Sequence, residues 1–201
     1  MKFARLVPIV LAACAPFAVA GPASAHTGLE TGFSLIDGAL HPLGGLDHLA
    51  AMVAVGIWAV LAGGKRIWVW PVAFVLMMLV GGFIGHAGIV LPAVEPAIAL
   101  SVVVLGLAVA FGLQAPVAMG AMLVGAFALF HGHAHGAEAP ATGWYGYAAG
   151  FATSTALLHV AGIAIGPAIA RPATPPPARP GDRRRNGCAR RHPDGPLKGA
   201  T

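Results

Sequence analysis

The feature that most constrains the fold is a succession of long apolar segments separated by short breaks. A helix that spans a bilayer needs about 20 mostly apolar residues. Five segments come close to or exceed this length, at residues 45–62, 67–90, 96–112, 115–131 and 144–169. Charged residues make up only 9% of the chain, whereas a soluble domain carries roughly 25%. We therefore predict an all-α fold, a polytopic membrane helix bundle with about five transmembrane helices.

The first 25 residues differ from this body and are typical of a cleaved signal peptide. Lys2 and Arg5 precede an apolar run that ends at the small-residue cleavage site Ala23-Ser24-Ala25. Cleavage there makes His26 the first mature residue, where its amine and imidazole together form a chelate; the alternative is that its position is an accident of where cleavage falls. A lipoprotein signal ending at Cys14 is the other interpretation of this segment.

Residues 171–201 form a basic, proline-rich segment that we expect to be a disordered cytoplasmic tail after the helix bundle of residues 26–170. Most of the basic residues lie in this tail, so the net charge of +5 provides no folded surface for nucleic acid. If Cys14 is removed with the signal peptide, Cys188 is the remaining cysteine. The bundle then has no thiolate to bind a metal ion.

The distribution of charge predicts how the bundle is oriented in a bacterial inner membrane. The positive-inside rule places Lys65 and Arg66 in the cytoplasm. The signal peptide independently places the mature N-terminus outside, and the tail is then cytoplasmic. By alternation, residues 131–143 lie on the outer side.

Two clusters of ionisable residues occur in this apolar chain, one at residues 41–52 and one at residues 131–138. Ionisable groups are costly in hydrocarbon and commonly mark an ion or substrate path. The predicted topology brings both clusters to the outer side of the membrane, where they can face one vestibule. His86 and Glu95 lie near the same side, whereas His159 lies deeper, ~22 Å below Trp144 at the rise of an α-helix.

The first cluster has the pattern of a helix start. Pro42 suits the first turn of a helix, with His41 extended before it. His48 and Met52 are then one turn apart on one face. Asp47 is about 100° away, so it either binds a metal ion or orients a neighbouring imidazole.

The second cluster has helical spacing. His131, His135 and Glu138 fall at positions i, i+4 and i+7 and would line one stripe if the fourth helix continued, but Gly132 and Gly136 weaken that assumption and favour a loop.

Imidazole nitrogens with a few carboxylates suit Ni²⁺, Co²⁺, Zn²⁺ or Cu²⁺, whereas Mg²⁺ prefers oxygen ligands. A lone histidine such as His86 or His159 is more often a hydrogen-bonded interior residue, and His133 alone would fit a nonspecific metal-binding loop. The candidate metal-binding residues are His26, His41, Asp47, His48, Met52, His86, Glu95, His131, His133, His135, Glu138 and His159.

The motif His-Pro-x-x-Gly-x-Asp-His-x-x-x-Met at residues 41–52 resembles the signature of the HupE/UreJ family of nickel/cobalt permeases, which are associated with hydrogenase and urease maturation. Residues 94–101, 130–138 and 156–159 also resemble the family pattern. The resemblance implies that His41, Asp47 and His48 are essential for uptake, with His131, His133, His135 and Glu138 as the next candidates. A sixth apolar span is expected after Gly166, and the basic tail stands in its place.

Three functions remain open from the sequence. The first is a permease, not an enzyme, that imports Ni²⁺, with Co²⁺ or Zn²⁺ as alternatives; its partners are the ion and the lipid bilayer, and it needs no organic cofactor. The second is a membrane-embedded zinc hydrolase with three imidazoles and an activated water. The third is a haem-binding electron carrier, which requires paired histidines at matched depths.

Overall fold

The computed structural model describes residues 34–62 and 66–170. The predicted signal peptide, His26 and the tail lie outside these residues. Regular structure in the described part is helical, and the helices are α2 (Ser34–Gly44), α3 (Leu46–Leu61), α4 (Val69–His86), α5 (Val94–Phe111), α6 (Val117–Ala137) and α7 (Trp144–Ile169).

The predicted membrane bundle is confirmed. The helices α4, α5, α6 and α7 are each long and apolar enough to cross a membrane, and α2 with α3 makes a fifth candidate if the bent pair counts as one span. The axes of α2 and α3 differ by 85° across a short break at Gly45. The first predicted span is therefore a 16-residue helix with a second helix set across its start.

The prediction that Pro42 opens a helix, with His41 extended before it, is wrong. Both residues lie in the last turns of α2, and Pro42 is buried inside that helix. The helix ends two residues after Pro42, so the amide hydrogen that proline lacks removes one hydrogen bond near the helix end and does not break a longer helix. As a result His41 is presented from a helix of its own and not from the start of α3.

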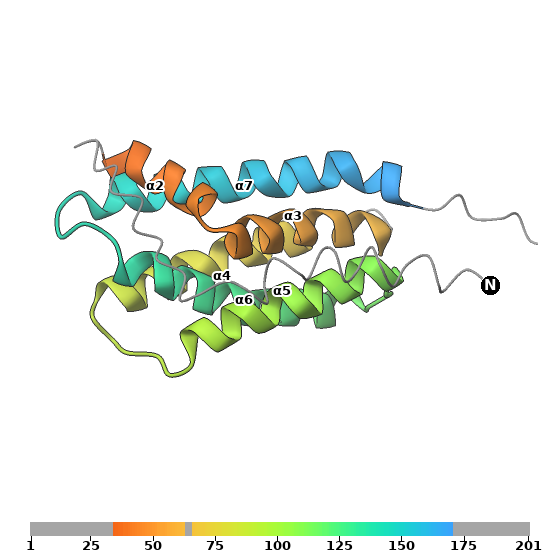
Figure 1. Ribbon diagram of the computed structural model, residues 1–201, viewed down its shortest axis with the longest axis horizontal. Helices are drawn as coiled ribbons and strands as arrows, with labels where there is room; N and C mark the ends of the chain where they lie inside the picture. Colours follow the sequence, from red (N-terminus) through yellow and green to blue (C-terminus); the bar gives the residue numbers. More distant parts are fainter. Residues whose placement is uncertain (1–33, 63–65, 171–201) are drawn as a thin grey trace, which may run out of the picture. The chain divides into compact units, whose positions relative to one another are not determined.

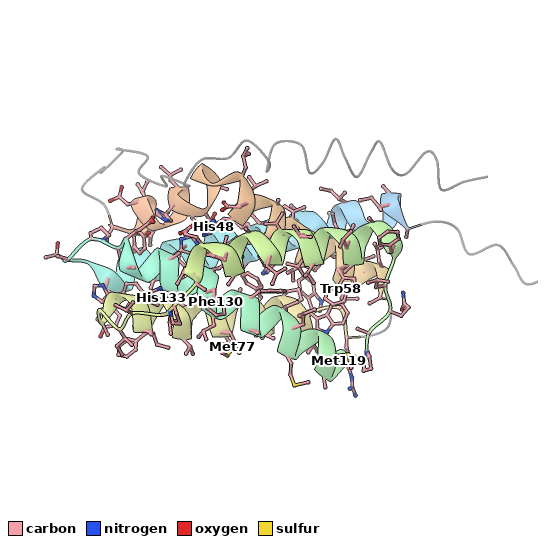
Figure 2. All side chains as sticks on the ribbon, turned by 60° about the horizontal axis from the view of Figure 1, so that its bottom comes forward. His48, Trp58, Met77, Met119, Phe130 and His133 are labelled. Atoms are coloured by element: carbon pink, nitrogen blue, oxygen red, sulfur yellow. The ribbon has the colours of Figure 1, made fainter. Side chains whose placement is uncertain are left out.

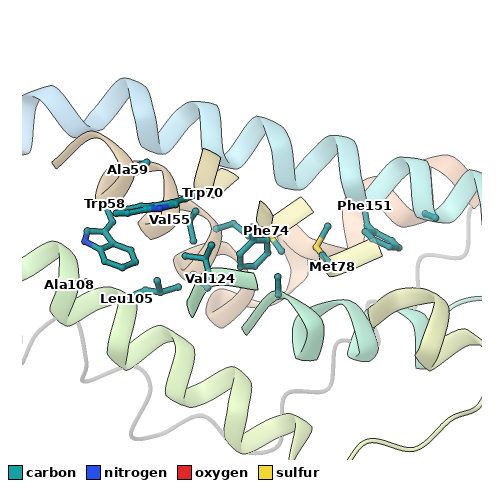
Figure 3. Close-up of a cluster of buried hydrophobic side chains, with 14 of the residues drawn as sticks. Val55, Trp58, Ala59, Trp70, Phe74, Met78, Leu105, Ala108, Val124 and Phe151 are labelled. Atoms are coloured by element: carbon teal, nitrogen blue, oxygen red, sulfur yellow. The ribbon is translucent and has the colours of Figure 1, made fainter. Parts of the chain in front are cut away.

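The helices are arranged so that α4 packs most extensively against α6, while α7 packs against both α2 and α3. Figure 1 shows α7 running alongside α2 and α3, with α5 and α6 on the other side of the bundle. Buried apolar side chains fill the space between them (Figure 3). At one end the Trp58 and Trp70 rings lie 4.3 Å apart and donate hydrogen bonds to the carbonyl oxygens of Leu113 and Val117. The two indole rings therefore pack together at this end of the bundle and join α3 to the segment between α5 and α6, and α4 to the first residue of α6.

Glycines bring α4 and α6 into backbone contact. A Cβ at Gly132 or Gly136 of α6 would collide with the backbone of α4, and one at Gly81 would collide with the backbone of α6. The small-residue spacing of membrane helices permits this approach. Since Gly132 and Gly136 face α4, the side chains of His131 and His135 are turned toward another part of the bundle.

The fourth predicted span is longer than expected. Residues 131–137 were expected to be a loop, but α6 continues to Ala137 and Glu138 is its C-cap. The glycines that weaken a helix in water are here the residues that allow close packing against α4. Consequently His131, His133 and His135 occupy a rigid helix.

Candidate metal site

Four imidazole rings form a continuous series where α2, α3 and α6 meet. The centroid of the His41 ring lies 4.8 Å from that of His135, which lies 4.7 Å from that of His48. The His48 ring in turn lies 4.7 Å from that of His131. Figure 2 shows His48 toward the end of the bundle opposite Trp58. The two histidine clusters, about eighty positions apart in the sequence, therefore meet, which agrees with the prediction that they can face one vestibule.

Asp47 determines which nitrogen of His48 carries the proton. Its Oδ1 atom lies 2.8 Å from the backbone nitrogen of His48 and 2.9 Å from Nδ1 of the same residue. A carboxylate oxygen can only accept hydrogen bonds, so the ring nitrogen beside it must donate. His48 is therefore protonated on Nδ1. The opposite nitrogen, Nε2, has a lone pair, is buried and has no hydrogen-bond partner in the described structure. Such a carboxylate–histidine pair is common at metal sites.

Ser101 of α5 has the same effect on His131. The Ser101 hydroxyl lies 2.6 Å from the carbonyl oxygen of Ile98 and 2.8 Å from Nε2 of His131. A hydroxyl has one hydrogen, which the carbonyl accepts, so Nε2 of His131 must donate to Ser101. The lone pair of His131 is then on Nδ1, which is also buried without a partner among the described residues.

His135 lies between His41 and His48 in the series and is fully buried. Neither of its ring nitrogens has a hydrogen-bond partner in the described part of the chain. Its ring stacks on Phe151 with a centroid distance of 5.3 Å and an interplanar angle of 19°. A buried polar group without a partner costs about 1–3 kcal/mol, so His135 is unfavourable for folding unless its nitrogens bind something.

The outer end of the series is more accessible. Nε2 of His41 lies 3.2 Å from Oε2 of Glu138, and the two side chains are 12% and 31% exposed. The Tyr147 ring lies 5.7 Å from that of His41, and its buried hydroxyl has no partner in the described structure. A carboxylate, an imidazole and a phenol therefore border the point where the series approaches the surface.

Other predicted site residues lie away from this series. His133 is on α6 between His131 and His135, but its Nε2 donates to the carbonyl oxygen of Ile89 at 2.7 Å. His86 stacks on Trp144, with centroids 4.5 Å apart, and Glu95 is exposed in the first turn of α5. The structure does not bring these three side chains to the other four histidines.

Met52 and His159 lie deeper. Met52 follows His48 by one turn of α3, as predicted, and is fully buried. Nδ1 of His159 donates to the backbone carbonyl oxygen of Met52 at 2.7 Å. These two residues join α3 to α7 below the series of imidazoles.

The chemistry of the series is that of borderline metal ligands. Imidazole lone pairs with two carboxylates nearby suit first-row divalent ions. Within residues 34–62 and 66–170, no three His, Cys, Asp or Glu side chains are placed to close around one ion. Each ring lies 4.7 to 4.8 Å from the next, so an ion can pass from one nitrogen ligand to a neighbouring one.

Ser101 and Tyr147 were absent from the candidates predicted from the sequence. Ser101 has a visible signal, because it is the one hydroxyl residue between Val94 and Phe111 in an apolar helix. Tyr147 has no comparable signal, since aromatic residues are common near the ends of membrane helices. Its place beside His41 depends on how α2 packs on α7.

Comparison with known proteins gives a consistent result. The chain matches the family described as HupE / UreJ protein over residues 13–181. The curated protein HupE of Rhizobium leguminosarum bv. viciae is 48% identical to it over 166 residues, which cover 82% of this chain and 84% of that relative. No solved structure gives a significant match.

Proposed function

The chain belongs to the HupE/UreJ family of membrane proteins, whose accessory role is in nickel and cobalt handling, and from this we propose that it is a permease. Its cargo is a divalent transition-metal ion, Ni²⁺ before Co²⁺, which it imports across the bacterial inner membrane for the maturation of hydrogenase or urease. The family match supports the permease over the zinc hydrolase and the haem carrier. No comparison or contact favours either alternative.

One observation carries the proposal: buried imidazole nitrogens without hydrogen-bond partners are concentrated in one place. His48 Nε2, His131 Nδ1 and both nitrogens of His135 have no partner in the described structure. Asp47 and Ser101 bind the opposite nitrogens of two of these rings, which leaves one lone pair on each ring without a partner. Neutral imidazole is the commonest metal ligand in proteins, and it suits first-row divalent ions.

The charges fit a divalent ion. Asp47 and Glu138 supply two carboxylates beside the imidazoles, and their combined charge matches that of one divalent cation. An ion passing into the bundle thus exchanges water for nitrogen ligands while its charge stays compensated. Glu138 and His41 receive the ion at the surface, and His135, His48 and His131 then bind it in sequence. Several sites of moderate strength allow an ion to enter and to leave.

The direction of transport follows from the orientation predicted by the charges. Arg66 lies at the end of the bundle near Trp58, whereas Glu138 lies at the opposite end. If basic residues face the cytoplasm, the histidine series opens to the outside. We expect a reporter enzyme fused at Gly143 to lie outside the cytoplasm. An alkaline phosphatase fusion at this position should therefore be active, and a β-galactosidase fusion should not. A fusion active only in the cytoplasm would reverse the proposed direction.

The experiment that tests the function is uptake of tracer Ni²⁺ by bacteria that express the chain and lack other nickel importers. We expect accumulation well above that of cells with an empty vector. Excess Co²⁺ should reduce it strongly, because both ions accept imidazole ligands, while excess Mg²⁺ should not. The proposal fails if cells with verified protein in the membrane accumulate no more Ni²⁺ than the vector control.

A further inference from the structure

A second group of buried sulfur, oxygen and nitrogen atoms, distinct from the four imidazoles, extends deeper into the bundle. It consists of Met52 on α3, Met78 on α4, and Thr155 and His159 on α7. Three of these side chains are fully buried, and His159 is 1% exposed. Thr155, Met78 and the Nε2 atom of His159 have no part in the transport step described so far.

Side chains of three helices meet at the Thr155 hydroxyl. Its oxygen lies 3.3 Å from the sulfur of Met52 and 3.6 Å from the sulfur of Met78. Thioether sulfur is a weak hydrogen-bond acceptor, so these contacts hold the hydroxyl only loosely. Two sulfur atoms and one hydroxyl oxygen are thus within reach of a single point.

His159 lies beside this group, because its ring is hydrogen-bonded to the backbone of Met52. It follows Thr155 by four positions on α7, which places both side chains on the same helix face. Because Nδ1 donates to the Met52 carbonyl oxygen, the lone pair of the ring is on Nε2. That atom is buried and has no partner in the described structure. The hydrogen bond from Nδ1 is enough to join α3 to α7. The lone pair on Nε2 contributes an interaction only if it accepts a hydrogen bond or binds a cation.

Phe74 connects this deeper group to the four imidazoles. Its ring centroid lies 5.7 Å from that of His131 and 5.1 Å from that of His159. Figure 3 shows Phe74 in the middle of the core, one turn from Met78 and between the Trp58–Trp70 pair and Phe151. Counted along their helices from the end of the bundle that bears Glu138, His131, Met78, Phe74 and His159 lie ~9, ~12, ~18 and ~22 Å inward at the rise of an α-helix, so the second group extends inward from the level of His131.

We propose that Met52, Met78, Thr155 and His159 form an inner station, beside Phe74, that binds the transported ion after it leaves His131. This inference rests on the proposed function. The imidazole nitrogen suits Ni²⁺, and a set of thioethers without a carboxylate serves Mg²⁺, Ca²⁺ and Mn²⁺ poorly. All four donors are neutral, so the station binds the ion less tightly than a site with a carboxylate and releases it onward. The inner station therefore also selects against hard cations.

The direct test is nickel K-edge X-ray absorption of the full-length protein, purified with selenomethionine in place of methionine and loaded with Ni²⁺. We expect selenium among the neighbours of nickel. Met52→Leu or Met78→Leu should weaken that signal, while Met77→Leu, which changes the adjacent methionine of α4, should not. Nickel bound to imidazole with no selenium neighbour would overturn the inner station and leave the proposed function intact. A protein that binds no nickel would overturn both.

Transport provides a second measurement. Thr155→Val removes the hydroxyl at nearly constant volume, and His159→Gln can still donate to the Met52 carbonyl oxygen without an imidazole lone pair. We expect each variant to slow Ni²⁺ uptake by about tenfold or more, the scale of effects at metal sites, while its thermal unfolding in detergent stays that of the parent. If both variants transport Ni²⁺ at the parental rate, the inner station does not exist.

Discussion

Replacing His48 with alanine is expected to lower Ni²⁺ uptake to the background of cells that lack the protein. The Nε2 lone pair of this residue is buried without a partner in the described structure, and its ring contacts those of both His131 and His135. Removing it takes away the ring that contacts both His131 and His135, and with it the nitrogen that α3 supplies between them. Membrane insertion should be preserved, because alanine makes α3 more apolar.

Two companion variants make this prediction specific. Asp47→Asn keeps the shape of the side chain and removes the charge beside Nδ1 of His48, so uptake should fall roughly 10- to 100-fold, as for other partners of metal-binding histidines. His133→Gln should transport like the parent, because glutamine can still donate to the carbonyl oxygen of Ile89. Tracer accumulation at low Ni²⁺ with matched membrane levels measures all three. If His48→Ala accumulates as much as the parent, residues 41–52 are only a polar helix boundary.

Replacing His135 with phenylalanine is expected to abolish uptake and to raise the thermal stability of the protein. The imidazole is fully buried, and neither nitrogen has a hydrogen-bond partner in the described structure. Phenylalanine removes both unpaired polar atoms, which cost about 1–3 kcal/mol when buried, and can retain the stacking on Phe151. The unfolding temperature measured in detergent should therefore rise, while tracer uptake should fall.

That opposition distinguishes a functional histidine from a structural one. If His135 stabilised the fold, the phenylalanine variant would unfold at a lower temperature and lose uptake for that reason. A lower unfolding temperature would thus contradict the assignment of unpaired nitrogens to His135. Parental uptake by the variant would contradict its place in the ion path.

The sequence predicted the helix class and most helix positions, because a membrane span requires a long apolar run. It missed α2, which has 11 residues, too few to span a bilayer, and contains Pro42. Proline is most common in the first turn of helices, so the pattern favoured a helix that begins at Pro42. The position of α2 is determined by its packing on α7, where Gly38 meets the backbone of Tyr147, and no local sequence pattern reports that contact.

The candidate site was predictable only in part. The meeting of the two histidine clusters followed from the alternation of membrane spans. The alternation of spans could not show that His131 and His135 join the series while His133 does not. That difference depends on which face of α6 packs against α4. Gly132 and Gly136 determine that face by close backbone contact, whereas in the sequence alone they weakened the case for a helix.

The most direct test of an imidazole path through this chain is the flux of tracer Ni²⁺ into sealed proteoliposomes that contain only the purified protein. The parent should show saturable influx, and His135→Phe, reconstituted at the same density, should show no more than protein-free vesicles. Equal influx through the parent and His135→Phe, or none through the parent, would contradict the account.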